Sequence, residues 1–288
     1  MTLSRQCLLL CGLGVLGTIG GTFPIEAQAE KEATTRLEAL PGTVVRWSVP
    51  GTKRCGMGRQ SWLALQETCY YPIDLEQKPG VLRVSRRGAG PAAYAQVSVL
   101  PAAYGREEIT LGDIPQANPT PADLRRNARD QVLVKKVWTR RVGPARFTLP
   151  LGPPARPLPE GKGFGAEWVF NGKPESAELH SGADFALPVS TPVVAVADGT
   201  VVIAEELFFA GNAVFIDHGD GLISMYFHMA DLKVQAGQDV KAGETLGVVG
   251  STGRVTGPHL HLGIRWHGAR IDPQLLLSDP AKIPAVGS

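Results

Sequence analysis

Six short apolar runs follow one another in the second half of the chain, and they end with His259-Leu-His-Leu-Gly-Ile-Arg-Trp266. Glycine or Asp-Gly turns separate the runs, which is the pattern of short strands joined by tight turns. The second half is therefore predicted to be a compact β domain. The six runs are Thr191–Ala197, Gly199–Ala204, Ala213–Asp217, Leu222–His228, Leu246–Gly250 and His259–Trp266.

The first half is also rich in short β-type runs. Turn signals recur there about every ten residues, as in a small β-sandwich or barrel. One helix is predicted over Pro121–Val134, where a proline stands early and charged residues are interspersed. The fold class is thus mainly β, with an N-terminal sandwich- or barrel-like domain that contains one helix. The runs are Thr43–Val49, Gly80–Ser85, Ala93–Leu100 and Glu108–Leu111.

Composition excludes several classes of protein. The 288 residues are 43% hydrophobic with a formal net charge of +2, so wholesale disorder is excluded and the net charge is too small to indicate a nucleic-acid partner. Past the N-terminal leader, no stretch approaches the roughly 20 uncharged apolar residues of a membrane span. The mature chain is therefore predicted to have no integral span.

A proline-rich stretch marks the predicted domain boundary. Five prolines lie between Pro150 and Gly163, which favours an extended spacer. We predict an N-terminal domain over 30–149, a linker over 150–162 and a C-terminal domain over 163–288. The stretch could instead begin the first strand of the second domain.

Charge also divides at this boundary. Residues 30–150 hold 19 Lys and Arg against 11 Asp and Glu, whereas residues 151–288 hold 9 against 15. The basic half could bind an acidic cell-wall polymer or present a solvated basic face. Since the halves carry opposite charge, the N-terminal domain could also cover the C-terminal one in a regulatory role.

The first 29 residues have the features of a secretory signal peptide. Arg5 supplies the positive end, an apolar segment follows, and Ala27-Gln-Ala29 forms a small-residue cleavage site. An uncleaved anchor is the alternative. The chain is therefore predicted to be exported, to a periplasm or to the extracellular cell envelope.

Cysteine usage agrees with export. Removal of the signal peptide leaves Cys55 and Cys69 alone, and one pair in an oxidising compartment most simply forms a disulfide. Two free thiols are the alternative.

All six histidines of the chain lie between His180 and His267. In His180-Ser-Gly-Ala-Asp184 the glycine argues against a helix, and a four-residue step along an extended chain places His180 and Asp184 on one face. With His259 and His261, this gives a set of imidazoles and one carboxylate that suits zinc, and three protein ligands would leave one position for water. The remaining histidine of the pair, together with His228, could move protons.

Several motifs in order resemble the lysostaphin/LytM-type zinc metallopeptidases. The resemblance covers about 110 residues, from Gly163 to Pro273. The motifs are His180-Ser-Gly-Ala-Asp-Phe-Ala186, Thr191-Pro-Val-Val-Ala-Val-Ala-Asp-Gly-Thr-Val201, Gly211-Asn-Ala-Val-Phe-Ile-Asp-His-Gly219, Tyr226-Phe-His-Met229 and Gly250-Ser-Thr-Gly-Arg-Val-Thr-Gly-Pro-His-Leu-His-Leu-Gly263.

The resemblance implies an antiparallel β core, a role for each site residue and a substrate. His180, Asp184 and His261 match the zinc ligands of the family, with one zinc ion per chain. His228 and His259 match its catalytic pair. The implied activity is the hydrolysis of peptide bonds in peptidoglycan, in cross-links or stem peptides, with peptidoglycan as the partner.

Two further expectations follow from the match. Some members of the family have lost ligands and act as non-catalytic wall-binding or hydrolase-activating proteins, but every matched position is intact here. Phe164-Gly-Ala-Glu-Trp168 departs from the family, because many relatives carry an arginine after Phe-Gly. We expect this departure to leave the metal site untouched and to alter the edge of the substrate groove.

His218 is expected to be a turn residue, and His267 to be exposed in a hairpin turn.

Overall fold

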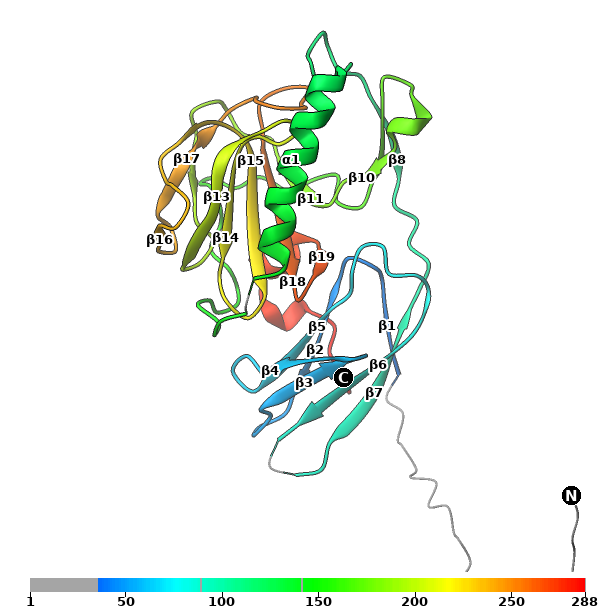
Figure 1. Cartoon of the computed structure of the whole chain (residues 1–288). Helices are drawn as coiled ribbons and strands as arrows, with labels where there is room; N and C mark the ends of the chain where they lie inside the picture. The colour runs from blue at the N-terminus through cyan, green and yellow to red at the C-terminus, as the bar shows by residue number, and fades with distance from the viewer. Residues whose placement is uncertain (1–35, 89, 141, 288) are drawn as a thin grey trace, which may run out of the picture. The chain divides into compact units, whose positions relative to one another are not determined.

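The computed structural model describes residues 36–88, 90–140 and 142–287 (Figure 1). The predicted signal peptide over 1–29 lies outside the described residues. Within them the predicted fold class is confirmed, because small N-terminal sheets and one long helix precede an antiparallel C-terminal sheet.

Two sheets build the N-terminal part. A five-stranded sheet has the order β1-β7-β6-β3-β4, and β2 pairs with β5 in a separate antiparallel ribbon. Only the β1–β7 pair within the five-stranded sheet is parallel. The strands are β1 (Arg36–Ala39), β2 (Val44–Ser48), β3 (Arg54–Met57), β4 (Gln60–Leu63), β5 (Thr68–Pro72), β6 (Gly80–Arg87) and β7 (Ala93–Val99).

One hydrophobic core lies between these two sheets. Alternate residues of β7 (Ala95, Val97 and Val99) point into it and meet Val45 and Tyr71 of the ribbon, as the two-residue period of a strand requires. The predicted disulfide is present and joins Cys55 of β3 to Cys69 of β5. The bond therefore links the two sheets across their common core.

A single long helix, α1 (Pro121–Trp138), follows. Thr120 begins it with a capping box, in which its side chain accepts from the backbone N–H of Asp123 while the Asp123 carboxylate accepts from the backbone N–H of Thr120. Val137 packs on β13, β14 and β15, so α1 lies across that face of the C-terminal sheet (Figure 1). The helix ends four residues beyond the predicted Val134, because Val137 and Trp138 pack on the sheet.

The C-terminal sheet has nine strands. Its main path runs β11-β18-β15-β14-β13-β16, while β17 pairs with β15 and β12, and β19 pairs with β18. Every pairing in it is antiparallel. The strands are β11 (Gly182–Phe185), β12 (Pro192–Val194), β13 (Gly199–Leu207), β14 (Gly211–Asp217), β15 (Leu222–Leu232), β16 (Asp239–Val240), β17 (Thr245–Val249), β18 (Leu260–Trp266) and β19 (Ala269–Ile271).

A small sheet of three strands stands beside the start of this domain. Strand β9 (Glu167–Phe170) pairs with β10 (Glu178–Leu179) in an antiparallel sense and with β8 (Arg106–Ile109) in a parallel sense. A 3-10 turn, Pro174–Ser176, precedes β10. Strand β8 belongs to the predicted N-terminal domain, so a strand pairing crosses the predicted boundary.

The segment over 150–162 packs on the C-terminal sheet rather than running free. Leu151 and Ala155 are buried in its core, and the backbone N–H of Gly152 donates to the carbonyl of Val196. The division at this segment stays a prediction.

The last described residues turn back to the N-terminal sheets. After β19 come the short helix α2 (Pro273–Leu277) and a 3-10 turn, Pro280–Lys282. Val286 then joins the N-terminal core, and its backbone N–H donates to the carbonyl of Arg46. The Arg270 side chain also donates to both carboxylate oxygens of Asp74, which lies just after β5.

Candidate metal centre and active site

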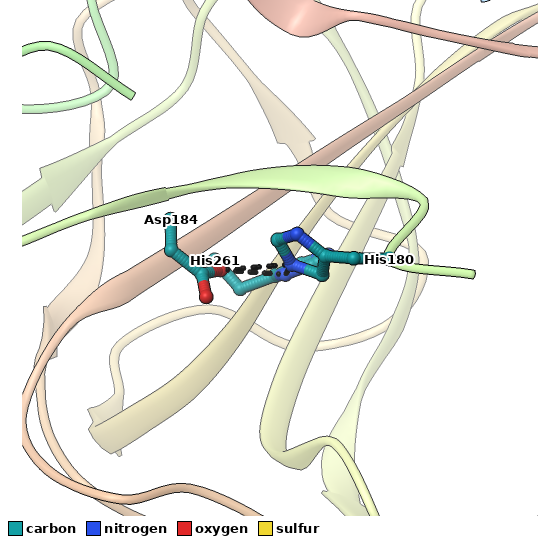
Figure 2. A group of neighbouring side chains, drawn as sticks. All are labelled: His180, Asp184 and His261. Carbon is teal, nitrogen blue, oxygen red and sulfur yellow. Dashed lines mark hydrogen bonds and ion pairs between the residues drawn. The ribbon is translucent and has the colours of Figure 1, made fainter. Parts of the chain in front are cut away.

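Three of the predicted site residues converge: one from β11, one from β18 and one from the segment just before β11. Asp184 on β11 stands directly opposite His261 on β18, and His180 lies just before β11 (Figure 2). His180 Nε2 lies 2.9 Å from His261 Nδ1 and 3.1 Å from Asp184 Oδ1. His261 Nδ1 lies 2.9 Å from the same oxygen. One ligand atom from each residue therefore meets the other two.

This triangle of atoms fits a zinc ion. With zinc–ligand distances of about 2.0–2.2 Å, tetrahedral geometry places ligand atoms roughly 3.3–3.6 Å apart, within a few tenths of an ångström of the separations here. Two imidazole nitrogens and one carboxylate oxygen are also the donors that zinc prefers. Among the described residues, this is the one group of histidines, cysteines and acids with the geometry to hold a metal.

The surroundings of Asp184 and His261 favour the protonation states that bind a metal. Burial raises the pKa of the Asp184 carboxyl, but hydrogen bonds from His180 and His261 outweigh burial and leave it below its ordinary value. Burial, together with the neighbouring His180, lowers the pKa of His261 although Asp184 opposes the shift. An ionised carboxylate and neutral imidazoles are the forms that bind zinc.

Two more histidines stand beside the cluster. The rings of His228 and His259 are 4.9 Å apart between centroids, and His259 Nε2 lies 3.6 Å from Asp184 Oδ2. His228 Nδ1 bonds to the carbonyl of Thr252, and His259 Nδ1 bonds to the carbonyl of Gly257, each at 2.9 Å. A carbonyl only accepts, so each Nδ1 carries a proton, and a ring in its neutral form then keeps a lone pair on Nε2.

His228 has an uncommon backbone conformation. Its φ is +65°, and it lies within β15 where the pairing with β14 shifts register. Such a conformation costs of order 1–3 kcal/mol and is concentrated at functional sites. Burial and the neighbouring His261 and His259 lower the pKa of His228 to about 3, so this imidazole is neutral at physiological pH.

A cavity of about 340 Å³ opens on the cluster. Asp184, His228 and His259 line one part of it, and Glu107 and Ile109 from the β8 strand line another. A substrate in this cavity would therefore touch residues from both sides of the predicted domain boundary.

Arg254 forms a wall of the cavity. Its guanidinium lies over the rings of Phe170 and Phe209, 4.0 and 4.5 Å from their centroids, and pairs with Glu178. Arg254 belongs to the Gly250–Gly263 motif, but nothing in the sequence predicts that two aromatic rings enclose it.

The stretch Phe164-Gly-Ala-Glu-Trp168 lies close to one of the predicted ligands, because the Trp168 ring stacks on the His180 ring, 3.8 Å between centroids at 16°. Trp168 also lines the cavity. Reasoning from the sequence missed this residue because the stacking depends on the pairing of β9 with β10.

The two remaining histidines lie outside the cluster. His218 is buried, and its ring bonds to the Ser224 hydroxyl and to the carbonyl of Asp198. His267 stacks on Trp62 of β4, and its side chain is only 8% exposed. The expectation that His267 is exposed is therefore wrong, because the N-terminal sheet covers it.

No helix in the described ranges has the length and apolar character needed to cross a membrane.

Comparisons with known proteins place the same segment in one family. The model of Peptidase family M23 matches residues 178–273. The peptidoglycan DD-endopeptidase ShyA of Vibrio cholerae is 48% identical over 82 residues, which are 28% of this chain and 19% of ShyA. The DD-carboxypeptidase/endopeptidase Mpg of Neisseria meningitidis is 45% identical over 95 residues, 33% of this chain and 22% of Mpg. The chain thus matches about a fifth of the length of these curated relatives.

A solved structure extends the likeness beyond this segment. A crystal structure from Pseudomonas aeruginosa, assigned to peptidase M23, is 30% identical to the chain with a TM-score of 0.62. The match covers 83% of this chain and 94% of that one, so it includes most of the residues before the M23 segment.

Proposed function

The chain belongs to peptidase family M23, and from this premise we propose that it is an exported zinc endopeptidase that hydrolyses peptide bonds in peptidoglycan. The observation that carries the proposal is the convergence of His180 Nε2, Asp184 Oδ1 and His261 Nδ1 within 3.1 Å of one another. ShyA and Mpg, similar over the same segment, support peptide cross-links or stem peptides as the substrate class.

His180, Asp184 and His261 would hold one zinc ion. Zinc bound there supplies Lewis acidity, which polarises the carbonyl of a peptide bond and lowers the pKa of water. The carboxylate of Asp184 also meets the second histidine pair through its other oxygen, 3.6 Å from His259 Nε2. The three ligands thus lie beside the groups proposed to move protons.

His228 and His259 are proposed as the proton-handling pair. Each offers a free Nε2 on a ring whose Nδ1 is fixed by a backbone carbonyl. An Nε2 lone pair can take a proton from the attacking water, and the imidazolium so formed can return it to the leaving amine. The imidazolium formed by that transfer can also stabilise the negative charge that develops on the carbonyl oxygen.

An envelope location is proposed with this function. Peptidoglycan lies outside the cytoplasmic membrane, and the Cys55–Cys69 disulfide suits an oxidising compartment. The predicted signal peptide over 1–29 would provide the export.

Digestion of purified sacculi tests the activity. With zinc present, the mature protein should release soluble muropeptides, and a strong chelator should stop the release. Mass analysis of the products would identify the bond that is cut. A failure to release fragments from any sacculus would favour the non-catalytic wall-binding or activating role, and release that survives chelation would contradict the dependence on zinc.

Two substitutions test the division of roles. His261→Ala should lose bound zinc, whereas His228→Ala should keep zinc and lose turnover, because only the former side chain reaches the ligand cluster. His267→Ala is the matched control, since this buried histidine lies outside the cluster, and it should keep both. Loss of zinc in the His228 and His261 variants alike would contradict the assigned roles.

A further inference from the structure

Among the described residues, the ring of His180 has no partner for the hydrogen bond that normally orients a zinc-binding histidine. A metal-binding imidazole almost always donates its other N–H to a carboxylate, a carbonyl or water, and this bond fixes the ring. His180 uses Nε2 toward the cluster. Its Nδ1 is buried and has no hydrogen-bond partner in the part of the chain that the structure describes.

The backbone of His180 is nevertheless firmly placed. Its N–H donates to the carbonyl of Ala166, and its carbonyl accepts from the N–H of Gly165, at 2.9 and 2.8 Å. These bonds fix the Cα but leave rotation about the side-chain bonds free. Something else must therefore set the direction of Nε2.

Trp168 supplies a flat wall for the ring. Its indole lies parallel to the imidazole within 16°, with 3.8 Å between centroids. Phe170 meets the indole edge-on at 6.2 Å. Because Trp168 lies in the middle strand of a three-stranded sheet, its own backbone is held on both sides.

Gly163 closes the slot at the edge of the ring. A Cβ built at this position would lie 2.8 Å from His180 Nδ1 and 3.4 Å from Trp168 Cζ2. Its φ of +81° is also a conformation that glycine adopts without strain. The imidazole thus lies against an indole face, and the backbone at its edge carries no side chain.

We propose that Trp168 is a positioning residue that fixes the orientation of the His180 ring, by stacking, in place of the missing hydrogen bond to Nδ1. The proposal rests on the proposed function, because it concerns a ligand of the proposed zinc site.

Zinc affinity of two Trp168 variants tests the proposal. Trp168→Leu removes the aromatic face, and affinity measured against a competing chelator should fall about 10- to 100-fold, the usual effect of losing an orienting partner. Trp168→Phe keeps a flat ring and should bind within a few-fold of the unmodified protein. The visible absorption of Co²⁺ placed in the site should change with Leu and be restored with Phe.

Two controls separate orientation from general stability. Trp47→Leu removes a partly buried indole of the N-terminal sheet that packs against Arg86, and it should leave zinc affinity unchanged. Thermal unfolding of each chelator-treated variant establishes that it is folded. If Trp168→Leu does not fold, Trp168→Met replaces it with the same expected loss of affinity.

The outcomes distinguish this proposal from the proposed function. If the unmodified protein binds zinc and Trp168→Leu binds it equally well, the positioning role is wrong while the metallopeptidase stands. Equal loss in the Leu and Phe variants also contradicts it, because a flat ring would then not suffice. An unmodified protein that binds no zinc overturns both.

Discussion

Gly182 determines how closely two ligand-bearing strands approach. It stands opposite Gly263 in the pairing of β11 with β18. A Cβ at Gly182 would lie 2.6 Å from the carbonyl oxygen of Leu262 and 2.5 Å from Nε2 of His261. Ordinary contact begins near 3.4 Å, so Gly182→Ala requires a shift of about 0.8 Å to restore ordinary contact with that carbonyl oxygen.

The shift must be taken by β11. Strand β18 is held between β11 and β15, and the carbonyl of Leu262 belongs to its backbone. Asp184 lies two residues after Gly182 on the moving strand, and its Oδ1 is 2.9 Å from His261 Nδ1. We therefore expect Gly182→Ala to widen the ligand cluster, to reduce zinc affinity about 10- to 100-fold and to destabilise the metal-free protein by about 1–3 kcal/mol.

Zinc titration and thermal unfolding measure these effects. Zinc stabilises the folded state according to its affinity, so each tenfold loss removes about 1.4 kcal/mol of that stabilisation at saturating zinc. Gly257→Ala is the matched control, because a Cβ there meets nothing within 4 Å and the residue lies two positions from His259. If Gly182→Ala binds zinc as tightly as the unmodified protein, β11 does not set the spacing of the ligands and the reasoning fails.

Two predictions concern the N-terminal part. Burial raises the pKa of the Asp74 carboxyl, but the hydrogen bonds from Arg270 outweigh burial and leave this pKa below its ordinary value. The contact therefore stabilises the fold at pH values above the ordinary pKa of an aspartate. That stabilisation is lost as the pH falls through the lowered pKa. Asp74→Asn should therefore cost about 1.5–3 kcal/mol at neutral pH, and denaturant unfolding should show the difference shrinking in acid; a constant difference would contradict the assignment. Replacing Cys55 and Cys69 together by alanine should lower the free energy of unfolding by about 3 kcal/mol with zinc affinity unchanged, and a loss of zinc affinity would show that the disulfide also shapes the site.

The sequence was sufficient for much of the site. The even spacing of His259 and His261 and the His180–Asp184 step indicated shared faces, and the structure brings all four together with His228. Spacing alone left open which of the paired histidines meets Asp184. The register of β11 on β18, which pairs Asp184 with His261, is set by long-range strand pairing, so only the resemblance could anticipate it.

Contacts between distant segments were the part that the sequence could not predict. Trp168 and His180 are 12 positions apart and meet only because β9 pairs with β10. His267 stands at a turn, as expected, but Trp62 of another sheet stacks on it. Likewise β8 showed the composition of a strand, while its partner β9 lies past the helix and the proline-rich segment. The local sequence pattern determines which residues are extended, whereas side-chain packing determines which strand pairs with which.

The return of the last residues to the N-terminal sheets limits what truncation can reveal. Ile283 is buried with the C-terminal core, and Val286 with the N-terminal one. A fragment that starts at Gly163 would keep Val286 without its pocket and leave Arg270 without Asp74. A change in the activity of such a fragment would not distinguish the removal of a regulatory first half from the loss of these contacts. Point substitutions in the intact chain are therefore the cleaner way to ask whether the first half restrains the second.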